Sequence, residues 1–187
     1  MIRSFIAFEI PESIRREIAR TMRQMATHWP EYRWVDTDQL HLTMNFLGDV
    51  PDEKITDVCQ VLRKVVPAFD AFSFTLSGLG AFPKAKRPRV LWLGVTEGAS
   101  QLSKLYYQLA DDLEHLRLER DRKAFRPHVT LARIRDRQRW SDSIVEKVEQ
   151  NDPLEMGVVD ANQLVLYSSH MEKGGPVYTP MDRVGLG

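Results

Sequence analysis

The sequence contains a single cysteine and no long hydrophobic run, and both absences exclude classes of protein. Cys59 has no second cysteine with which to form an intramolecular disulfide, which predicts a reducing, cytoplasmic environment. No window approaches 18 consecutive apolar residues, so we expect no membrane span and no membrane partner. The N-terminal stretch MIRSFIAFEIPES lacks the apolar region and cleavage pattern of a signal peptide. A soluble protein is expected.

Charge of one sign is not in excess either. The chain has 26 Lys and Arg against 26 Asp and Glu, so its formal net charge is zero. This balance excludes a polycation, an acidic tail and a charge-driven disordered segment. With 43% hydrophobic residues in 187, the chain can bury a core of its own. The sequence carries no signal of oligomerisation, and we expect a monomer.

Hydrophobic periodicity predicts a mixture of strands and helices. Alternating or β-branched runs indicate strands, and apolar residues repeating every three or four positions indicate amphipathic helices. The predicted strands cover residues 2–9, 41–48, 71–82, 90–95, 128–134, 163–169 and 176–184, and the predicted helices cover 12–25, 52–65, 100–118 and 141–150. Without a regular βαβ alternation, this order predicts an α+β fold with two largely antiparallel sheets flanked by helices.

The order strand, helix, strand, strand occurs twice, over residues 41–95 and 128–184. Each block opens with histidine, an apolar residue, threonine and another apolar residue: HLTM at 41–44 and HVTL at 128–131. This similarity suggests an internal duplication. Because no Pro-, Gly- or Ser-rich linker separates the blocks, we expect residues 1–187 to form a single bilobal domain around a central cleft.

The two His-x-Thr motifs are the strongest functional signal. Side chains alternate along a strand, so His41 and Thr43 share one face, as do His128 and Thr130. Five histidines and nine threonines would produce about 0.24 such motifs by chance in this length. A lone copy would most simply be a structural histidine beside a strand threonine. Two copies at equivalent places in a duplication favour a functional pair.

Two imidazoles facing one cleft can perform complementary proton transfers. One can deprotonate an incoming water while the other protonates a departing oxygen. In-line displacement at phosphorus requires the nucleophile and the leaving group to lie on opposite sides of the phosphorus atom. Two pseudo-symmetric lobes would place the two histidines on these opposite sides. The hydroxyls of Thr43 and Thr130 can donate to the phosphate oxygens. This scheme needs no metal or cofactor, and the remaining histidines, at 28, 115 and 170, show no zinc-ligand spacing.

These motifs resemble the paired HxTx motifs of the two-histidine (2H) phosphoesterase superfamily. Within it, the whole chain is similar to the RNA 2′,3′-cyclic phosphodiesterases, also known as LigT-type RNA 2′-5′ ligases. The matching segments occur in the same order: SFIAFEIP, HLTMNFLGDV, VLWLGV, FRPHVTLAR and LYSSHMEKGGPVYTPM. The resemblance implies a bilobal α+β fold, a role in RNA processing, no metal, and hydrolysis of RNA 2′,3′-cyclic phosphate ends to 2′-phosphates, with reversible 2′-5′ ligation as a further activity. It also implies that His41 is the proton donor and His128 the proton acceptor.

Basic residues cluster around the second motif, over residues 117–139, and in the loop KAKRPR at 84–89. Both are candidate contacts for an RNA backbone or, alternatively, solvated surface. Arg126 is a candidate substrate-binding residue because it lies closest before the motif. Alternation places Arg133 on the face opposite His128 unless the strand ends or bulges. Among the aromatics, Phe8, Trp34, Phe46 and Tyr178 are candidates for base stacking or for the core.

Two other functions remain open. The same chemistry could act on a small cyclic nucleotide, such as a cyclic phosphate of ADP-ribose, or on a 2′-5′ oligonucleotide. Alternatively, the chain could be a non-catalytic RNA-binding module whose histidines are structural. RNA binding alone does not require matched imidazoles in both lobes. The two intact motifs therefore favour the enzyme hypothesis over the binding module.

Overall fold

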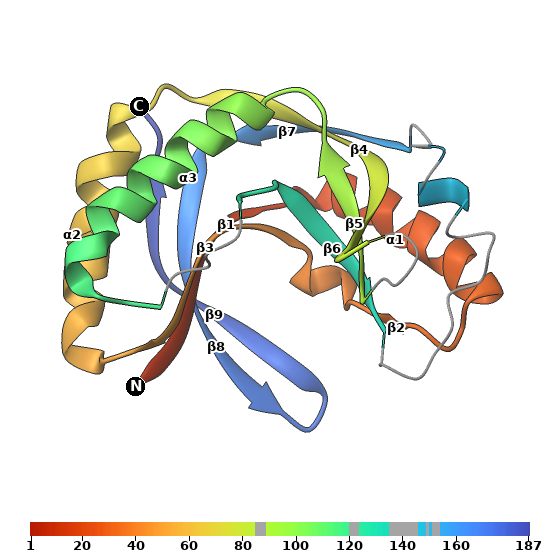
Figure 1. Cartoon of the computed structure of the whole chain (residues 1–187), viewed down its shortest axis with the longest axis horizontal. Coiled ribbons are helices and arrows are strands. Elements are labelled where there is room, and N and C mark those ends of the chain that lie inside the picture. Colours follow the sequence, from red (N-terminus) through yellow and green to blue (C-terminus); the bar gives the residue numbers. More distant parts are fainter. Residues whose placement is uncertain (85–88, 120–123, 135–145, 149, 151–153) are drawn as a thin grey trace.

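The computed structural model describes residues 1–84, 89–119, 124–134, 146–148, 150 and 154–187. These residues form a strongly curved antiparallel sheet with helices on its outer side (Figure 1). The strands are β1 (Ile2–Glu9), β2 (Arg33–Trp34), β3 (His41–Val50), β4 (Phe72–Phe82), β5 (Val90–Val95), β6 (His128–Arg133), β7 (Glu155–Ala161), β8 (Gln163–Glu172) and β9 (Gly175–Gly185). The long helices are α1 (Glu12–His28), α2 (Ile55–Val65) and α3 (Ala99–Leu113).

Most elements form where hydrophobic periodicity places them. In α1 the residues that repeat every three or four positions, Ile14, Ile18, Met22 and Met25, are all buried. The same holds for Val58, Leu62 and Val65 in α2. These faces form because a helix this short is stabilised mainly by packing its apolar stripe against the sheet.

One local prediction was wrong, and two strands were not predicted. The helix expected to reach residue 118 ends at Leu113, and a short 3-10 turn follows over Glu114–Leu116. Strand β7 was not predicted, because Gly157 interrupts its pattern with a φ of 125°. The two-residue strand β2 is too short to leave a periodic signal. Of the polar helix expected over 141–150, residues 146–148 are helical, and most of the remainder lies outside the described residues.

The strands form one sheet of order β7-β4-β5-β6-β3-β1-β8-β9, with β2 paired to β6. The predicted α+β class with antiparallel pairing is confirmed, but the two expected sheets are joined through β3 and β6. The hairpin that comes after each motif strand in the sequence pairs in the half of the sheet that contains the other motif strand. After β3 the chain adds β4 and β5 beside β6, and β8 and β9 pair beside β1, next to β3. The halves of the sheet are therefore not the halves of the sequence.

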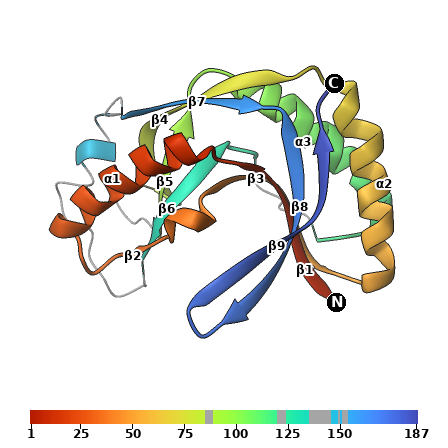
Figure 2. The ribbon, with the colours of Figure 1, turned by 180° about the vertical axis from the view of Figure 1, so that it is seen from behind.

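Helices cover the two halves separately. Helix α1 contacts β7, whereas α2 and α3 contact each other and pack on β9 and β3 respectively. Seen from behind, the β8–β9 hairpin extends well beyond its neighbouring strands (Figure 2). The described helices include none long and apolar enough to cross a membrane.

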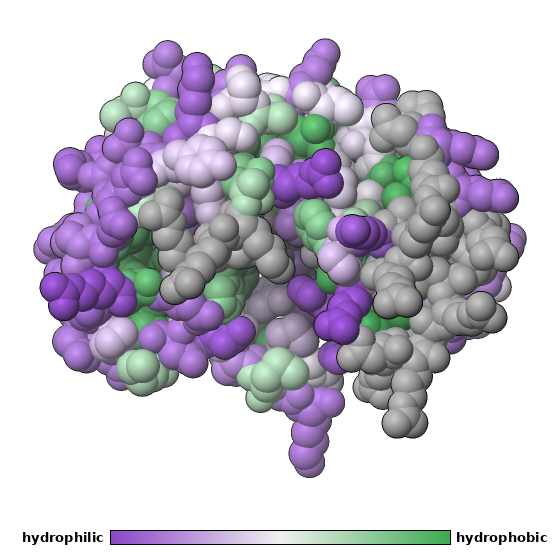
Figure 3. Space-filling view, viewed as in Figure 1, coloured by the Kyte–Doolittle hydropathy of each residue, from purple (hydrophilic) through white to green (hydrophobic). Residues whose placement is uncertain are grey.

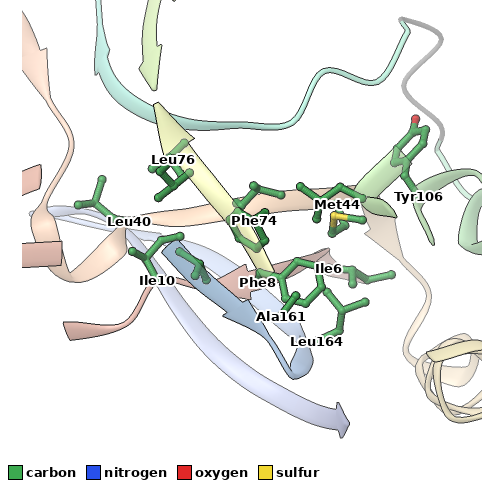
Figure 4. Close-up of a cluster of buried hydrophobic side chains, with 14 of the residues drawn as sticks. Ile6, Phe8, Ile10, Leu40, Met44, Phe74, Leu76, Tyr106, Ala161 and Leu164 are labelled. Carbon is green, nitrogen blue, oxygen red and sulfur yellow. The ribbon is translucent and has the colours of Figure 1, made fainter. Parts of the chain in front are cut away.

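The core is continuous between the halves. Figure 4 shows Phe8 of β1 beside Phe74 of β4, and their ring centroids are 5.9 Å apart. Ile6, Met44 and Leu164 from one half belong to the same buried cluster as Leu76 from the other. Truncation of a buried phenylalanine costs about 3–5 kcal/mol, so the Phe8–Phe74 contact helps to hold the halves in a fixed relation.

Candidate active site

The two motif strands meet at the centre of the sheet. Leu42 of β3 pairs with Val129 of β6, and both side chains are completely buried. Because side chains alternate, the neighbouring His41, Thr43, His128 and Thr130 point to the opposite face. Since the strands are antiparallel, His41 and Thr130 lie on one side of the Leu42–Val129 pair, and Thr43 and His128 on the other.

The structure brings all four motif side chains into one cavity of about 630 Å³, which we call the His41 cavity. It lies between β3, β6 and the β8–β9 hairpin. Its other described lining residues are Arg3, Phe5, Arg33, Trp34, Val35, Asp36, Gln39, Phe46, Arg133, Ser169, Met171, Gly174, Pro176 and Tyr178. Of the four aromatic candidates for base stacking, Trp34, Phe46 and Tyr178 line this cavity, whereas Phe8 belongs to the core.

Both imidazoles are held in the same way. Nδ1 of His41 lies 2.7 Å from the carbonyl oxygen of Gln39, and Nδ1 of His128 lies 2.7 Å from that of Arg126. A carbonyl oxygen only accepts, so each Nδ1 must carry a proton and donate it. The neutral ring therefore presents the lone pair of Nε2 to the cleft. This arrangement fixes both the tautomer and the orientation needed for proton transfer.

Aromatic side chains pack against each histidine. The His41 ring lies 4.9 Å from Phe5 and 5.2 Å from Tyr178, with the Tyr178 contact edge-on at 86°. The His128 ring lies 5.0 Å from Phe82, edge-on at 84°, and 6.0 Å from Trp92. Except for Tyr178, sequence reasoning did not single out these aromatics. Only the pairing of β1 with β3 and of β5 with β6 brings Phe5 and Trp92 to the histidines.

This packing also changes the protonation of the site. Burial lowers the pKa of His41 below its ordinary value, against the opposing effect of the Gln39 carbonyl, and the nearby His128 and Arg133 lower it further. Burial likewise lowers the pKa of His128, and Arg133 and Arg126 add to the effect. At neutral pH both imidazoles are mainly neutral in the unliganded protein.

Arg133 enters the site because β6 contains a bulge. Trp92 pairs with Thr130 and Leu91 with Ala132, so Leu131 is the extra residue on β6. Beyond this bulge the alternation is reversed, and Arg133 returns to the face of His128 and Thr130. Arg133 lines the His41 cavity beside both histidines. Strict alternation predicts the far face for Arg133, and the bulge in β6 is the physical reason for the difference.

Arg126 lies beside His128 but does not line the His41 cavity. Its carbonyl holds the imidazole, while its guanidinium lies 5.5 Å from the ring centroid of Trp92. The side chain borders a second cavity of about 1000 Å³, which we call the Phe125 cavity. Much of the basic segment 117–139 and of the loop 84–89 lies outside the described residues. Arg117, Arg133, Lys84 and Arg89 are described.

The remaining histidines lie away from these cavities. Nδ1 of His28 is 3.0 Å from the carbonyl oxygen of Gln24 at the end of α1, and His115 and His170 are exposed. Within the described part of the chain, no three His, Cys, Asp or Glu side chains are grouped so as to hold a metal ion.

Comparison with known proteins points to one family. A family model described as the 2′-5′ RNA ligase superfamily matches residues 10–171. The RNA 2′,3′-cyclic phosphodiesterase of Thermotoga maritima is 32% identical over 177 residues, covering 95% of this chain and 91% of that protein. The crystal structure of TT0787 of Thermus thermophilus has a TM-score of 0.83 at 27% identity, covering 98% of this chain and 97% of that one.

A second solved structure, Escherichia coli LigT complexed with 3′-AMP, has a TM-score of 0.80 at 28% identity, covering 99% of this chain and 98% of that one. The family match, the identity with a curated relative over nearly the whole chain and the shared fold agree. The chain therefore belongs to the 2′-5′ RNA ligase superfamily and, within it, to the RNA 2′,3′-cyclic phosphodiesterases.

Proposed function

We propose that this protein hydrolyses the 2′,3′-cyclic phosphate ends of RNA to 2′-phosphates, with His128 as general base and His41 as general acid. The observation that supports this most strongly is the matched pair of imidazoles in one cavity. Each donates from Nδ1 to a backbone carbonyl and presents Nε2 to the cleft. A purely structural histidine has no need of a partner held in the same way on the other half of the sheet.

The reaction begins when Nε2 of His128 removes a proton from a water molecule. The water oxygen attacks phosphorus opposite O3′, the P–O3′ bond breaks, and O3′ takes the proton from Nε2 of His41. The 2′-phosphate remains. Thr43 and Thr130 donate hydrogen bonds to the non-bridging oxygens, and the Arg133 guanidinium offsets the charge that develops on them.

Substrate binding favours the protonated form of the acid, which takes its proton from solvent. Because burial lowers the pKa of His41, the unliganded imidazole is mainly neutral at pH 7. The negative charge of a bound phosphodiester favours the imidazolium and raises that pKa. The acid is therefore charged when substrate is present, while His128 must remain neutral to accept a proton.

The substrate is an RNA end, and residues 1–187 act as one bilobal domain. The cavity admits a nucleotide beside Trp34 and Tyr178, and Arg3 and Arg33 line it where a phosphate backbone would pass. The solved LigT complex with 3′-AMP supports nucleotide binding in this fold. We place the reaction in the cytoplasm, since a lone cysteine suits a reducing compartment.

The test is the identity of the product. The protein is incubated with 2′,3′-cyclic AMP and with an RNA ending in a 2′,3′-cyclic phosphate, both in excess EDTA, and 2′- and 3′-phosphates are separated by chromatography. We expect 2′-phosphate from the RNA, because proton transfer by two histidines requires no metal. A 3′-phosphate product, or activity that returns only with added Zn²⁺ or Mg²⁺, would contradict the proposal. Turnover of the mononucleotide alone would identify a small-nucleotide enzyme, and RNA binding without turnover a binding module.

A further inference from the structure

The end of the β8–β9 hairpin lies beyond the rest of the sheet. Among the described residues, the pairing of β1 with β8 ends at Ser168, and from Ser169 to Tyr178 the two strands of the hairpin pair only with each other. We call residues 169–178 the hairpin tip. In Figure 3, seen from the same side as Figure 1, the molecule is hollowed near its centre and the hairpin tip protrudes at the lower edge. Side-chain contacts must therefore fix the position of the tip.

The hairpin tip forms one wall of the His41 cavity. Its lining residues are Ser169, Met171, Gly174, Pro176 and Tyr178. Met171 is a large apolar residue that is 72% exposed. A nucleotide bound in the cavity would bury part of that side chain, which is favourable. The position of the hairpin tip consequently determines the shape of the site.

Gln39 connects this wall to His41. Its backbone carbonyl oxygen accepts the hydrogen bond from Nδ1 of His41, at 2.7 Å. Its side-chain Nε2 donates to the carbonyl oxygen of Pro176, in the hairpin tip. The Gln39 side chain is half-buried and lines the cavity itself. One residue therefore holds both the imidazole and the hairpin tip.

Tyr178 completes a closed set of contacts around the imidazole. It follows Pro176 by two residues on β9, and its ring lies edge-on to His41 with centroids 5.2 Å apart. The same ring lies 5.0 Å from Phe5, which also packs against His41. Because Gln39 binds Pro176 and Tyr178 contacts His41, a displacement of the hairpin tip would loosen the imidazole.

His128 is held differently. The carbonyl that accepts from its Nδ1 belongs to Arg126, whose guanidinium lies 5.5 Å from the ring centroid of Trp92. Trp92 belongs to β5, which pairs with β4 on one side and β6 on the other. The aromatic packing of His128 thus includes a strand in the middle of the sheet, whereas that of His41 includes the protruding hairpin tip.

We propose that Gln39 is a positioning residue for the general acid: its side chain fixes the hairpin tip, and with it Tyr178, against His41, so that Nε2 faces the departing O3′. This inference rests on the proposed function and on its assignment of His41 as the acid. Gln39 forms and breaks no covalent bond, and the proton still passes from His41 to O3′. Proton transfer is sensitive to small misplacements of the reacting groups, so loss of the Gln39–Pro176 hydrogen bond should slow the step that His41 performs.

The first test uses Gln39→Met, which keeps the length of the side chain and removes its hydrogen-bond donor. We expect kcat for 2′,3′-cyclic AMP to fall about 10–100-fold and KM to change less than about threefold. An activated aryl phosphodiester, whose leaving group needs no proton, should be hydrolysed within about threefold of the wild-type rate. Gln60→Met is the matched control, because Gln60 is exposed on α2, and it should retain wild-type kinetics with both substrates.

The outcomes of this test separate the two proposals. Absence of turnover in the wild-type protein would overturn the proposed function. Wild-type turnover with an unchanged kcat in Gln39→Met would overturn the present inference alone. An equal loss with both substrates, or a raised KM at unchanged kcat, would also overturn it, since Gln39 would then act on the fold as a whole or on substrate binding.

The second test asks whether Gln39 acts through Tyr178. The imidazole C–H signals of His41 should shift in the NMR spectrum of Gln39→Met, because the Tyr178 ring moves, while those of His128 stay in place. Gln39→Met combined with Tyr178→Leu should have the same kcat as Tyr178→Leu alone, since contacting residues are not additive. Unchanged His41 signals, or losses of kcat that multiply in the double variant, would overturn the coupling through the hairpin tip.

Discussion

Leu42 and Val129 form the one residue pair assigned between β3 and β6 among the described residues, and this pair joins the two halves of the sheet. The flanking residues on both strands turn their side chains into the cleft. The antiparallel direction then sets each histidine near the threonine of the other motif. If more residues of β3 and β6 were paired, the two strands would lie side by side and close the space between them. The single pair therefore joins the two halves of the sheet and still leaves room for the His41 cavity.

The first prediction concerns the roles of the two histidines. His41→Ala and His128→Ala should each lower kcat by about 10²–10⁴-fold, because each removes one of two proton transfers. An activated aryl phosphodiester, whose leaving group needs no proton, should partly rescue His41→Ala but not His128→Ala.

His28→Ala is the matched control for these variants, because His28 is exposed at the end of α1. It should retain wild-type kinetics with both substrates. Rescue of His128→Ala in place of His41→Ala would reverse the assignment. Rescue of neither would show that the imidazoles contribute mainly to binding.

The pH dependence of kcat/KM should be bell-shaped, with its maximum below about pH 6.5. This parameter reports the free protein, in which burial lowers the pKa of both His41 and His128 below the ordinary value of 6.5. Activity needs one imidazole charged and the other neutral. Rising pH therefore removes the proton of the acid, and falling pH protonates the base.

The measurement is a pH series at low substrate concentration, together with NMR titration of the imidazole C–H signals. Inorganic phosphate should move both midpoints upward, since an anion favours imidazolium. A maximum near pH 8, or midpoints above 6.5 without phosphate, would contradict the effect of burial.

Arg133→Gln should reduce kcat/KM by about 10–100-fold, the usual loss of about 1.5–3 kcal/mol when a charged hydrogen bond is removed. The bulge at Leu131 turns this guanidinium toward both histidines. Arg133→Lys should recover part of the loss by restoring the charge. Arg23→Gln, an exposed position on α1, is the control and should have no effect. Wild-type kinetics in Arg133→Gln would mean that the bulge serves packing only.

Gly80→Ala should impair catalysis through Trp92. A Cβ at Gly80 would lie 2.0 Å from the Trp92 ring, which must therefore move. Trp92 in turn packs against both His128 and the Arg126 guanidinium. Overpacking of this kind costs about 1–3 kcal/mol, and we expect a lower kcat with a smaller effect on KM.

The comparison for that variant is Gly185→Ala, where the nearest atom to the new Cβ is 3.8 Å away. It should retain both stability and activity in thermal unfolding and steady-state assays. If Gly80→Ala loses stability but keeps the wild-type kcat and pH profile, Trp92 has no positioning role toward His128.

Local patterns in the sequence were enough to predict the long helices, most of the strands and the face of each motif strand. These features depend on short-range rules: a helix buries every third or fourth residue, and a strand buries every second. The same alternation was sufficient to pair His41 with Thr43 and His128 with Thr130. The repeated motif also indicated two equivalent strands, and β3 and β6 are those strands.

The segments that surround the motifs are set by long-range pairing in the folded chain. The exchange of hairpins between the halves brings Trp92 and Phe82 to His128 and Tyr178 to His41, and the pairing of β1 with β3 brings Phe5 to His41. The extra residue Leu131, which turns Arg133 into the cleft, is visible only against its partner strand β5. Strand pairing and bulges depend on contacts between residues distant in sequence, and local periodicity carries no information about those contacts.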